Sequence, residues 1–227
     1  MTVTTKWIII AIVLLLMPAA ASTYVLLSPK RHWASDPVIC VKSPGHTSIA
    51  DSDKGITATI NALNGSGGWN DTSVGLVLNA VSTTANNSPC SNQWQLGDGQ
   101  PTIAFDEVIK GACSGTCLAA TFISFYDCDP VVNGFCEILD ADVLTRKNRA
   151  DKSGGPYYSL SESGSPQQCT PGKEWNIEAI MVHEVGHVLG IGHTNVSGAT
   201  MYPSVSSCNP NGTTIEQDDK DALNALY

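Results

Sequence analysis

The stretch of sequence that decides the fold spans residues 183–193 and reads His-Glu-Val-Gly-His-Val-Leu-Gly-Ile-Gly-His. It overlaps residues 176–189, whose apolar side chains recur at helical spacing and therefore predict an α-helix. His183 and His187 are four residues apart, so both imidazoles would project from one face of that helix and could bind one metal ion. Glu184 follows the first histidine, where a carboxylate can reach a metal-bound water without itself becoming a ligand.

Two glycines and a third histidine complete the pattern. Gly190 and Gly192 allow the chain to leave the helix and turn back, which would bring His193 to the same metal ion. Three nitrogen ligands leave a fourth tetrahedral position for water, and this open position is typical of catalytic rather than structural zinc. Zinc would lower the pKa of that water towards about 7, and Glu184 would take up the proton. The pattern therefore predicts amide hydrolysis by zinc-activated water.

The alternative interpretation of these residues is an ordinary core helix whose histidines are satisfied by hydrogen bonds. A bare His-Glu-x-x-His pattern would leave that alternative open, because two histidines and a glutamate meet by chance fairly often. The extended pattern fixes five positions and would arise by chance in on the order of one in 100,000 such chains. We therefore interpret residues 183–193 as a zinc site.

Residues 183–193 resemble the zinc-binding consensus of the metzincin metallopeptidases, and their surroundings resemble the matrixin branch. Thr194 follows the third histidine, where matrixins usually carry Ser and other metzincin branches carry Asp, Glu or Pro. Residues 199–203, Ala-Thr-Met-Tyr-Pro, resemble the matrixin Met-turn, so the resemblance implies that Met201 lies beneath the zinc. Residues 217–227 resemble the end of a matrixin catalytic domain, in which Asp219 is expected to hold the backbone of the Met-turn.

The resemblance implies an α+β fold. In the metzincin zinc-protease fold, a twisted mixed β-sheet carries a backing helix and an active-site helix, and a small C-terminal subdomain holds the Met-turn and a terminal helix. The sequence patterns agree with this outline, since apolar spacing predicts helices over residues 56–63 and 215–227. Runs rich in Val, Ile, Phe and Tyr predict strands at residues 74–81, 102–105, 119–126 and 138–143.

Two segments are expected to bind the substrate. Residues 138–143 resemble the edge strand that runs antiparallel to the bound peptide in matrixins, so Ile138 and Leu139 are candidate substrate-binding residues. The alternative is an interior strand with solvated aspartates. Pro203 and Val205 lie where matrixins build the wall of the pocket for the residue after the scissile bond. The family usually has an aromatic residue where Val205 stands, which leaves the shape of that pocket open.

The metal content is predicted as one catalytic zinc ion. The structural zinc of vertebrate matrixins uses further histidines, whereas only His32 and His46 are left here, and both are expected in surface loops. Calcium is a second candidate cofactor, since aspartates could supply oxygen ligands, but their spacing matches no defined calcium loop. The aspartates concerned are Asp127, Asp129, Asp140 and Asp142.

Composition restricts the partners and the compartment. The chain of 227 residues has a formal net charge of −9 and no basic run, which excludes a nucleic-acid ligand. Its eight cysteines fit four disulfides in an oxidising compartment. Eight cysteines allow 105 connectivities, and the set that we favour is Cys40–Cys90, Cys113–Cys117, Cys128–Cys136 and Cys169–Cys208.

The first residues have the layout of a secretory signal peptide. Lys6 precedes an apolar stretch at residues 7–17, and small residues follow at 18–21. We expect residues 1–21 to be removed and residues 22–227 to form one catalytic domain, with no room for an inhibitory propeptide. The alternative is an uncleaved membrane anchor. The expected protein is a secreted, extracellular monomer with no stable membrane association after signal cleavage.

The sequence thus predicts a secreted zinc-dependent endopeptidase that acts on proteins or peptides. Two other functions remain as alternatives. One is a secreted binding or surface protein that retains zinc only for folding, although a structural site needs no glutamate base. The other is a metallopeptidase of a different metzincin branch, against which Thr194 and Met201 argue.

Overall fold

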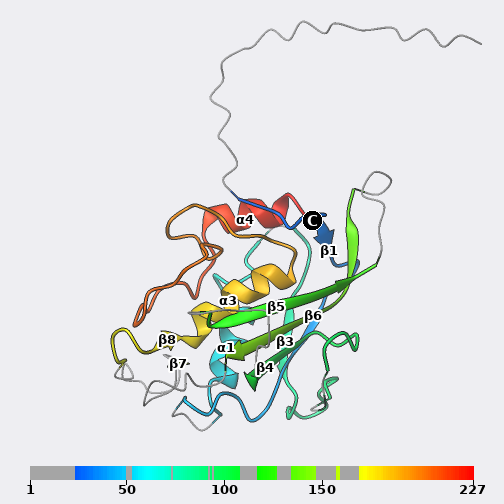
Figure 1. Cartoon of the computed structure of the whole chain (residues 1–227). Coiled ribbons are helices and arrows are strands. Elements are labelled where there is room, and N and C mark those ends of the chain that lie inside the picture. Colours follow the sequence, from blue (N-terminus) through cyan, green and yellow to red (C-terminus); the bar gives the residue numbers. More distant parts are fainter. Residues whose placement is uncertain are drawn as a thin grey trace, which may run out of the picture.

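The protein is described by a computed structural model, in which a mixed sheet packs against helices (Figure 1). The helices are α1 (Ile56–Asn64), α3 (Ile177–Val188) and α4 (Gln217–Asn224). In Figure 1, α3 lies between the sheet and α4, the helix near the C-terminus. The structure describes residues 24–49, 53–72, 74–91, 93, 95–107, 117–126, 134–146, 157–158 and 169–227.

The main sheet has the strand order β1-β6-β4-β2-β3, and β5 pairs with β6. All pairs are parallel except β5 with β6, which is antiparallel. A second, two-stranded parallel sheet joins β7 (Tyr157–Tyr158) to β8 (Trp175–Asn176). The strands of the main sheet are β1 (Arg31–His32), β2 (Val38–Val41), β3 (Asn79–Ser82), β4 (Thr102–Glu107), β5 (Ala119–Phe125) and β6 (Cys136–Arg146).

These elements confirm the α+β prediction and most of the predicted segments. The strand expected over residues 74–81 is shorter, because the carboxamide of Asn70 bonds both backbone groups of Leu78 and β3 begins only after it. Strand β2 was not predicted. Its four residues, Val-Ile-Cys-Val, are too short a run to stand out, yet they occupy the interior of the sheet between β4 and β3.

The hydrophobic core lies between the sheet and the helices α1 and α3. Ile39 and Ile103 from the sheet have no exposed surface, and neither have Leu63 of α1 and Val182 of α3. Each such aliphatic side chain contributes about 1.5–3 kcal/mol through burial. This shared core fixes the position of α3 relative to the strands, and with it the position of the histidines.

Strand β6 is an interior strand, which corrects the expectation that residues 138–143 form the edge of the sheet. It pairs with β5 on one side and with β1 and β4 on the other. Ile138 is buried, while Leu139 is 37% exposed. Beyond β6 on its other side lies β5, an outer strand that pairs only with β6 among the described strands. The sequence could not distinguish the two, because both strands are apolar runs and their order depends on contacts distant in sequence.

Two of the favoured disulfides are confirmed. Cys40 bonds to Cys90, and Cys169 bonds to Cys208. Cys117 and Cys136 are disulfide-bonded as well, but their expected partners, Cys113 and Cys128, lie outside the described residues. Within the part of the chain that the structure describes, no helix combines the length and the apolar character needed to cross a membrane.

Candidate metal centre

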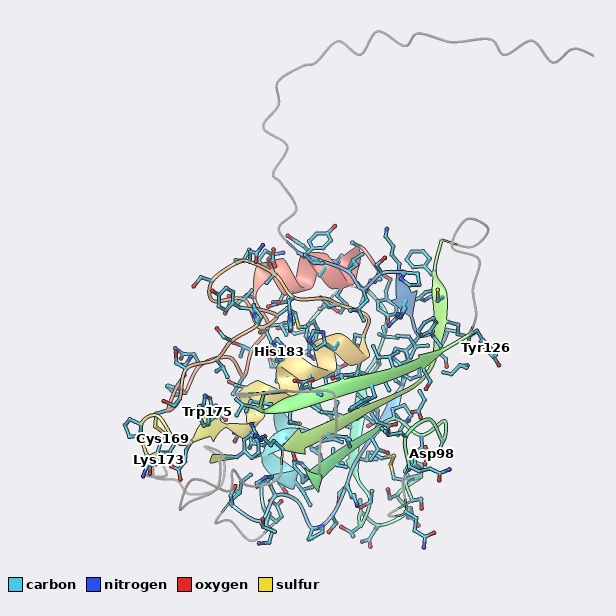
Figure 2. The ribbon with its side chains drawn as sticks, viewed as in Figure 1. Asp98, Tyr126, Cys169, Lys173, Trp175 and His183 are labelled. Atoms are coloured by element: carbon cyan, nitrogen blue, oxygen red, sulfur yellow. A yellow bond between two sulfur atoms is a disulfide. The ribbon has the colours of Figure 1, made fainter. Side chains whose placement is uncertain are left out.

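The helix α3 that carries the first two histidines begins at a defined cap. The side chain of Asn176 accepts a hydrogen bond from the backbone N–H of Glu178 at 3.1 Å, which satisfies one of the free N–H groups of the first turn. Nearly every residue of the helix is buried. Figure 2 shows His183 on the side of the helix that faces the C-terminal segments.

The two helical histidines are held in one tautomer. Nδ1 of His183 lies 2.6 Å from the carbonyl oxygen of Thr200, and Nδ1 of His187 lies 2.7 Å from that of Ile191. A carbonyl oxygen only accepts, so each Nδ1 carries the proton and donates it. The lone pair is then on Nε2 of each ring, and the backbone carbonyls orient these nitrogens as they do in metal sites.

The turn that leads to the third histidine is held by the N-terminal part of the chain. Gly190 has a φ of 95°, and a Cβ at this position would overlap the carbonyl oxygen of Arg31. The N–H of Leu27 donates to the carbonyl of Gly190 at 3.1 Å, and the N–H of Gly192 donates to the carbonyl of Val25 at 2.7 Å. This short antiparallel contact sets the path of the backbone directly before His193.

The three histidines converge on one point. Nε2 of His193 lies 3.2 Å from Nε2 of His183 and 3.1 Å from Nε2 of His187. Zinc–nitrogen bonds of about 2.0–2.1 Å at tetrahedral angles would separate the nitrogens by roughly 3.3 Å. Burial lowers the pKa of all three imidazoles, that of His183 to about 4. The neutral rings and their spacing fit a zinc ion.

The Met-turn lies against the same helix. Met201 is 1% exposed, and a Cβ on Gly186 would overlap its sulfur, so the methionine packs directly on the glycine between the two histidines. The carboxylate of Asp219 accepts hydrogen bonds from the backbone N–H groups of Thr200 at 2.8 Å and Met201 at 3.0 Å. Asp219 therefore holds the Met-turn, as the sequence resemblance implied.

Glu184 lies beside the histidines with only 7% of its surface exposed. Burial raises the pKa of its carboxyl group above the usual value. The hydroxyl group of Thr121 on β5 lies 2.6 Å from Oε2 of Glu184 and 3.1 Å from its backbone carbonyl oxygen. Sequence reasoning missed Thr121, because no local pattern indicates which strand residue lies next to the helix.

Comparison with known proteins supports the geometry. The sequence model of the matrixin family matches residues 89–227, which is more than half of the chain. The chain belongs to the matrixin family. It is 35% identical to Metalloendoproteinase 1 of Glycine max over 163 residues, and this alignment covers 60% of the chain and 52% of the soybean protein.

Shorter alignments place vertebrate matrixins among the similar proteins. The chain is 40% identical to Matrix metalloproteinase-18 of Xenopus laevis and 36% identical to Neutrophil collagenase of Homo sapiens, each over 53 residues. Each of these alignments covers 23% of the chain and 11% of the relative. The chain therefore spans about half or less of the length of the relatives that it matches.

Neither remaining histidine of this matrixin lies in a surface loop as expected, and His32 is a half-buried residue of β1. His46 is completely buried and does not lie in a surface loop, which corrects the prediction. Its Nδ1 accepts from the backbone N–H of Ser48 at 3.1 Å, and its Nε2 lies 3.2 Å from the carbonyl oxygen of Arg146. Among the described residues, His183, His187 and His193 form the one group of three potential ligands close enough for a metal ion.

Pro203 and Val205 follow the Met-turn of this matrixin. Pro203 is exposed, and Val205 is half-buried against the core. The indole N–H of Trp175 donates to the carbonyl of Val205 at 3.2 Å, which ties this segment to the start of α3. The pocket wall expected here remains a prediction.

The aspartates of β6 are buried in this matrixin, whereas the alternative interpretation of residues 138–143 was an interior strand with solvated aspartates. Asp140 is 1% exposed and accepts from the N–H of Gly99 at 3.1 Å, while Asp142 is 2% exposed and accepts from the N–H of Gly97 at 3.2 Å. Burial, followed by the charge of Asp140, raises the pKa of Asp142 to about 7. Asp127 and Asp129 lie outside the described residues, and a calcium site remains a prediction.

Proposed function

We propose that this matrixin is a zinc-dependent endopeptidase in which His183, His187 and His193 bind the zinc and Glu184 is the general base. The observation that carries the proposal is the convergence of three Nε2 atoms next to a buried glutamate. A site that served folding alone would be closed by a fourth protein ligand. Among the described residues, no fourth histidine, cysteine or acid joins the group.

The roles of the residues follow from their positions. Zinc, when bound, polarises the carbonyl of the scissile peptide bond and acidifies a water molecule. Glu184 accepts the proton of that water and then delivers it to the leaving amine. The carbonyls of Thr200 and Ile191 keep His183 and His187 in the tautomer that binds metal. Met201 forms the floor of the site beneath them.

The substrate would bind along the open edge of β5. The carbonyl of Leu118 accepts from the N–H of Arg146 on β6 at 2.8 Å. Because hydrogen-bonded pairs alternate along an antiparallel ladder, the backbone groups of Thr121 and Ile123 are directed away from β6. An extended peptide can add to this edge as a further strand. This role replaces the one first assigned to Ile138 and Leu139.

The remaining specificity would come from the segment after the Met-turn. Pro203 and Val205 would form the wall of the pocket for the residue after the scissile bond. Valine is smaller than an aromatic residue, so it leaves more room at this position. We further propose that residues 1–21 direct export, that residues 22–227 form the catalytic domain and that the mature protein is a secreted monomer. The disulfides support an oxidising compartment.

The proposal is tested by expressing the full chain, purifying the exported product and assaying it on casein. We expect cleavage of casein, loss of cleavage with a zinc chelator and a new N-terminus after Ala21. Glu184→Gln should lower kcat/KM by at least about 100-fold because the base is lost, while the variant still binds one zinc ion per chain.

The control variant is Glu137→Gln, the same chemical change at an exposed position on β6, which should keep the activity of the parent. A parent protein that binds zinc and cleaves neither casein nor an unstructured peptide library would overturn the proposal in favour of a binding protein. An active Glu184→Gln variant would overturn the assigned base.

A further inference from the structure

A hydroxyl group from the outer strand β5 lies next to the proposed general base. Oγ1 of Thr121 is 2.6 Å from Oε2 of Glu184 and 3.1 Å from the carbonyl oxygen of the same residue. A hydroxyl has one proton to donate. The shorter contact and the charge of the carboxylate both favour donation to Oε2. Of the described residues, Thr121 alone hydrogen-bonds this carboxylate.

Glu184 needs such a contact if it is to act as a base. A glutamate side chain has several rotatable bonds, and ordering it costs up to about 2 kcal/mol of conformational entropy. A hydrogen bond to Oε2 holds the carboxylate in one orientation and leaves Oε1 to receive the proton. Thr121 is β-branched and therefore has a restricted χ1 angle on its strand, so the donor is itself well ordered.

The position of Thr121 in the sheet links its contact with Glu184 to the open edge of β5. Its side chain points towards α3, while its backbone groups are directed at the open edge of β5. The residue that holds the base is thus also a residue that would pair with the substrate. A peptide docked on this edge is placed in fixed register with the carboxylate of Glu184.

We propose that Thr121 is a positioning residue that fixes the carboxylate of Glu184 from the substrate-binding strand. This inference rests on the proposed peptidase function. It assigns Thr121 an effect on the chemical step rather than on peptide binding, because the hydroxyl contacts the base and the backbone groups of Thr121 are retained in any substitution except proline.

The test compares Thr121→Val and Thr121→Ser in the full chain, exported and loaded with zinc. Valine keeps the shape and the β-branching and removes only the donor, so kcat should fall about 5–20-fold while KM changes less than about twofold. Serine keeps the hydroxyl and should restore at least half of kcat. Zinc content and zinc affinity should be equal in all three proteins, since the hydroxyl group of Thr121 bonds to Glu184 and to none of the three histidines.

A matched control is Thr102→Val on β4, which removes a buried hydroxyl that donates to the carbonyl of Gln100 at 2.8 Å, away from the site. It reports what the loss of one strand hydroxyl costs in stability, and its kcat should equal that of the parent. The proposal is overturned if Thr121→Val keeps the parent kcat, or if Thr121→Ser is as impaired as Thr121→Val. A parent without peptidase activity would instead overturn the proposed function.

Discussion

Two of the outer strands of the sheet, β3 and β5, differ in whether their free edge is paired. On β3, the carboxamide of Asn64 bonds both backbone groups of Ala80, at 2.9 Å and 2.8 Å. Directly before β3, Asn70 does the same for Leu78 at 2.7 Å and 2.9 Å. On β5, the alternating backbone groups that face away from β6 are directed at an edge without a further described strand.

The difference shows which edge is available to a peptide. Unpaired strand edges invite pairing with other chains, and proteins usually cover them. The two asparagines imitate a neighbouring strand and close the edge at β3. The edge strand β5 packs against α3 and is joined to it through Thr121 and Glu184. The open edge is thus the one at β5, where a substrate paired with the strand would lie close to Glu184.

The largest expected effect comes from opening the closed edge. Replacing Asn64 and Asn70 by alanine removes four hydrogen bonds and leaves backbone groups of the buried residues Leu78 and Ala80 without partners. We expect the free energy of unfolding to fall by about 2–4 kcal/mol, measured by urea denaturation, with concentration-dependent association through the freed edge.

The control for this double variant is Asn61→Ala, on the exposed surface of the same helix α1. Alanine favours the helix, so Asn61→Ala should be neutral or slightly stabilising. If the double variant is as stable as this control, the two asparagines do not close the edge.

A smaller effect is expected from blocking the open edge. Ile123→Pro removes one backbone N–H that is directed away from β6, and proline is tolerated on an edge strand in this orientation. KM for a peptide substrate should rise about tenfold, because the substrate loses about one hydrogen bond to the strand, while kcat should stay nearly unchanged. The comparison variant is Ile123→Ala, which loses the same packing and keeps the N–H. Equal KM values for the two variants would place the substrate elsewhere.

The smallest expected effect is on the pH dependence of stability, and it concerns β6, an interior strand between β5 and β3. The pKa of Asp142 on β6 is raised by burial to about 7, above its ordinary value of 3.8. Folding therefore favours the protonated form of Asp142. The stability that this carboxyl group contributes is fully present below about pH 4 and is lost as the pH rises through 7.

Asp142→Asn is neutral at every pH and should remove this dependence. We expect the free energy of unfolding of the variant to exceed that of the parent by about 1 kcal/mol at pH 8 and to equal it near pH 4. Urea denaturation at both pH values measures this difference. KM should not change, since Asp142 faces neither edge. A parent that is more stable than the variant at pH 8 would show that the ionised carboxylate has a partner, such as a cation.

The grouping of the three histidines could be predicted because its signals are local. The spacing of His183 and His187 within one helix is fixed by the backbone geometry, and Gly190 marks the turn before His193. The Met-turn was found by its resemblance to matrixins, and Asp219 bonds to it as expected. The strand order was not accessible, because pairing between strands distant in sequence leaves no local pattern.

By itself, then, the sequence predicted the helix, the grouping of the three histidines beside Glu184 and the family. The tertiary structure decided that β5 is an outer strand, that Thr121 lies against Glu184 and that residue 186 has no room for a side chain. Helix propensity alone would favour alanine at 186 by about 1 kcal/mol, yet a Cβ there would overlap the sulfur of Met201 and approach the ring of Trp69 to 2.8 Å. Local backbone geometry fixes which side chains project from one face of a helix. Packing between distant segments fixes which residues those side chains contact.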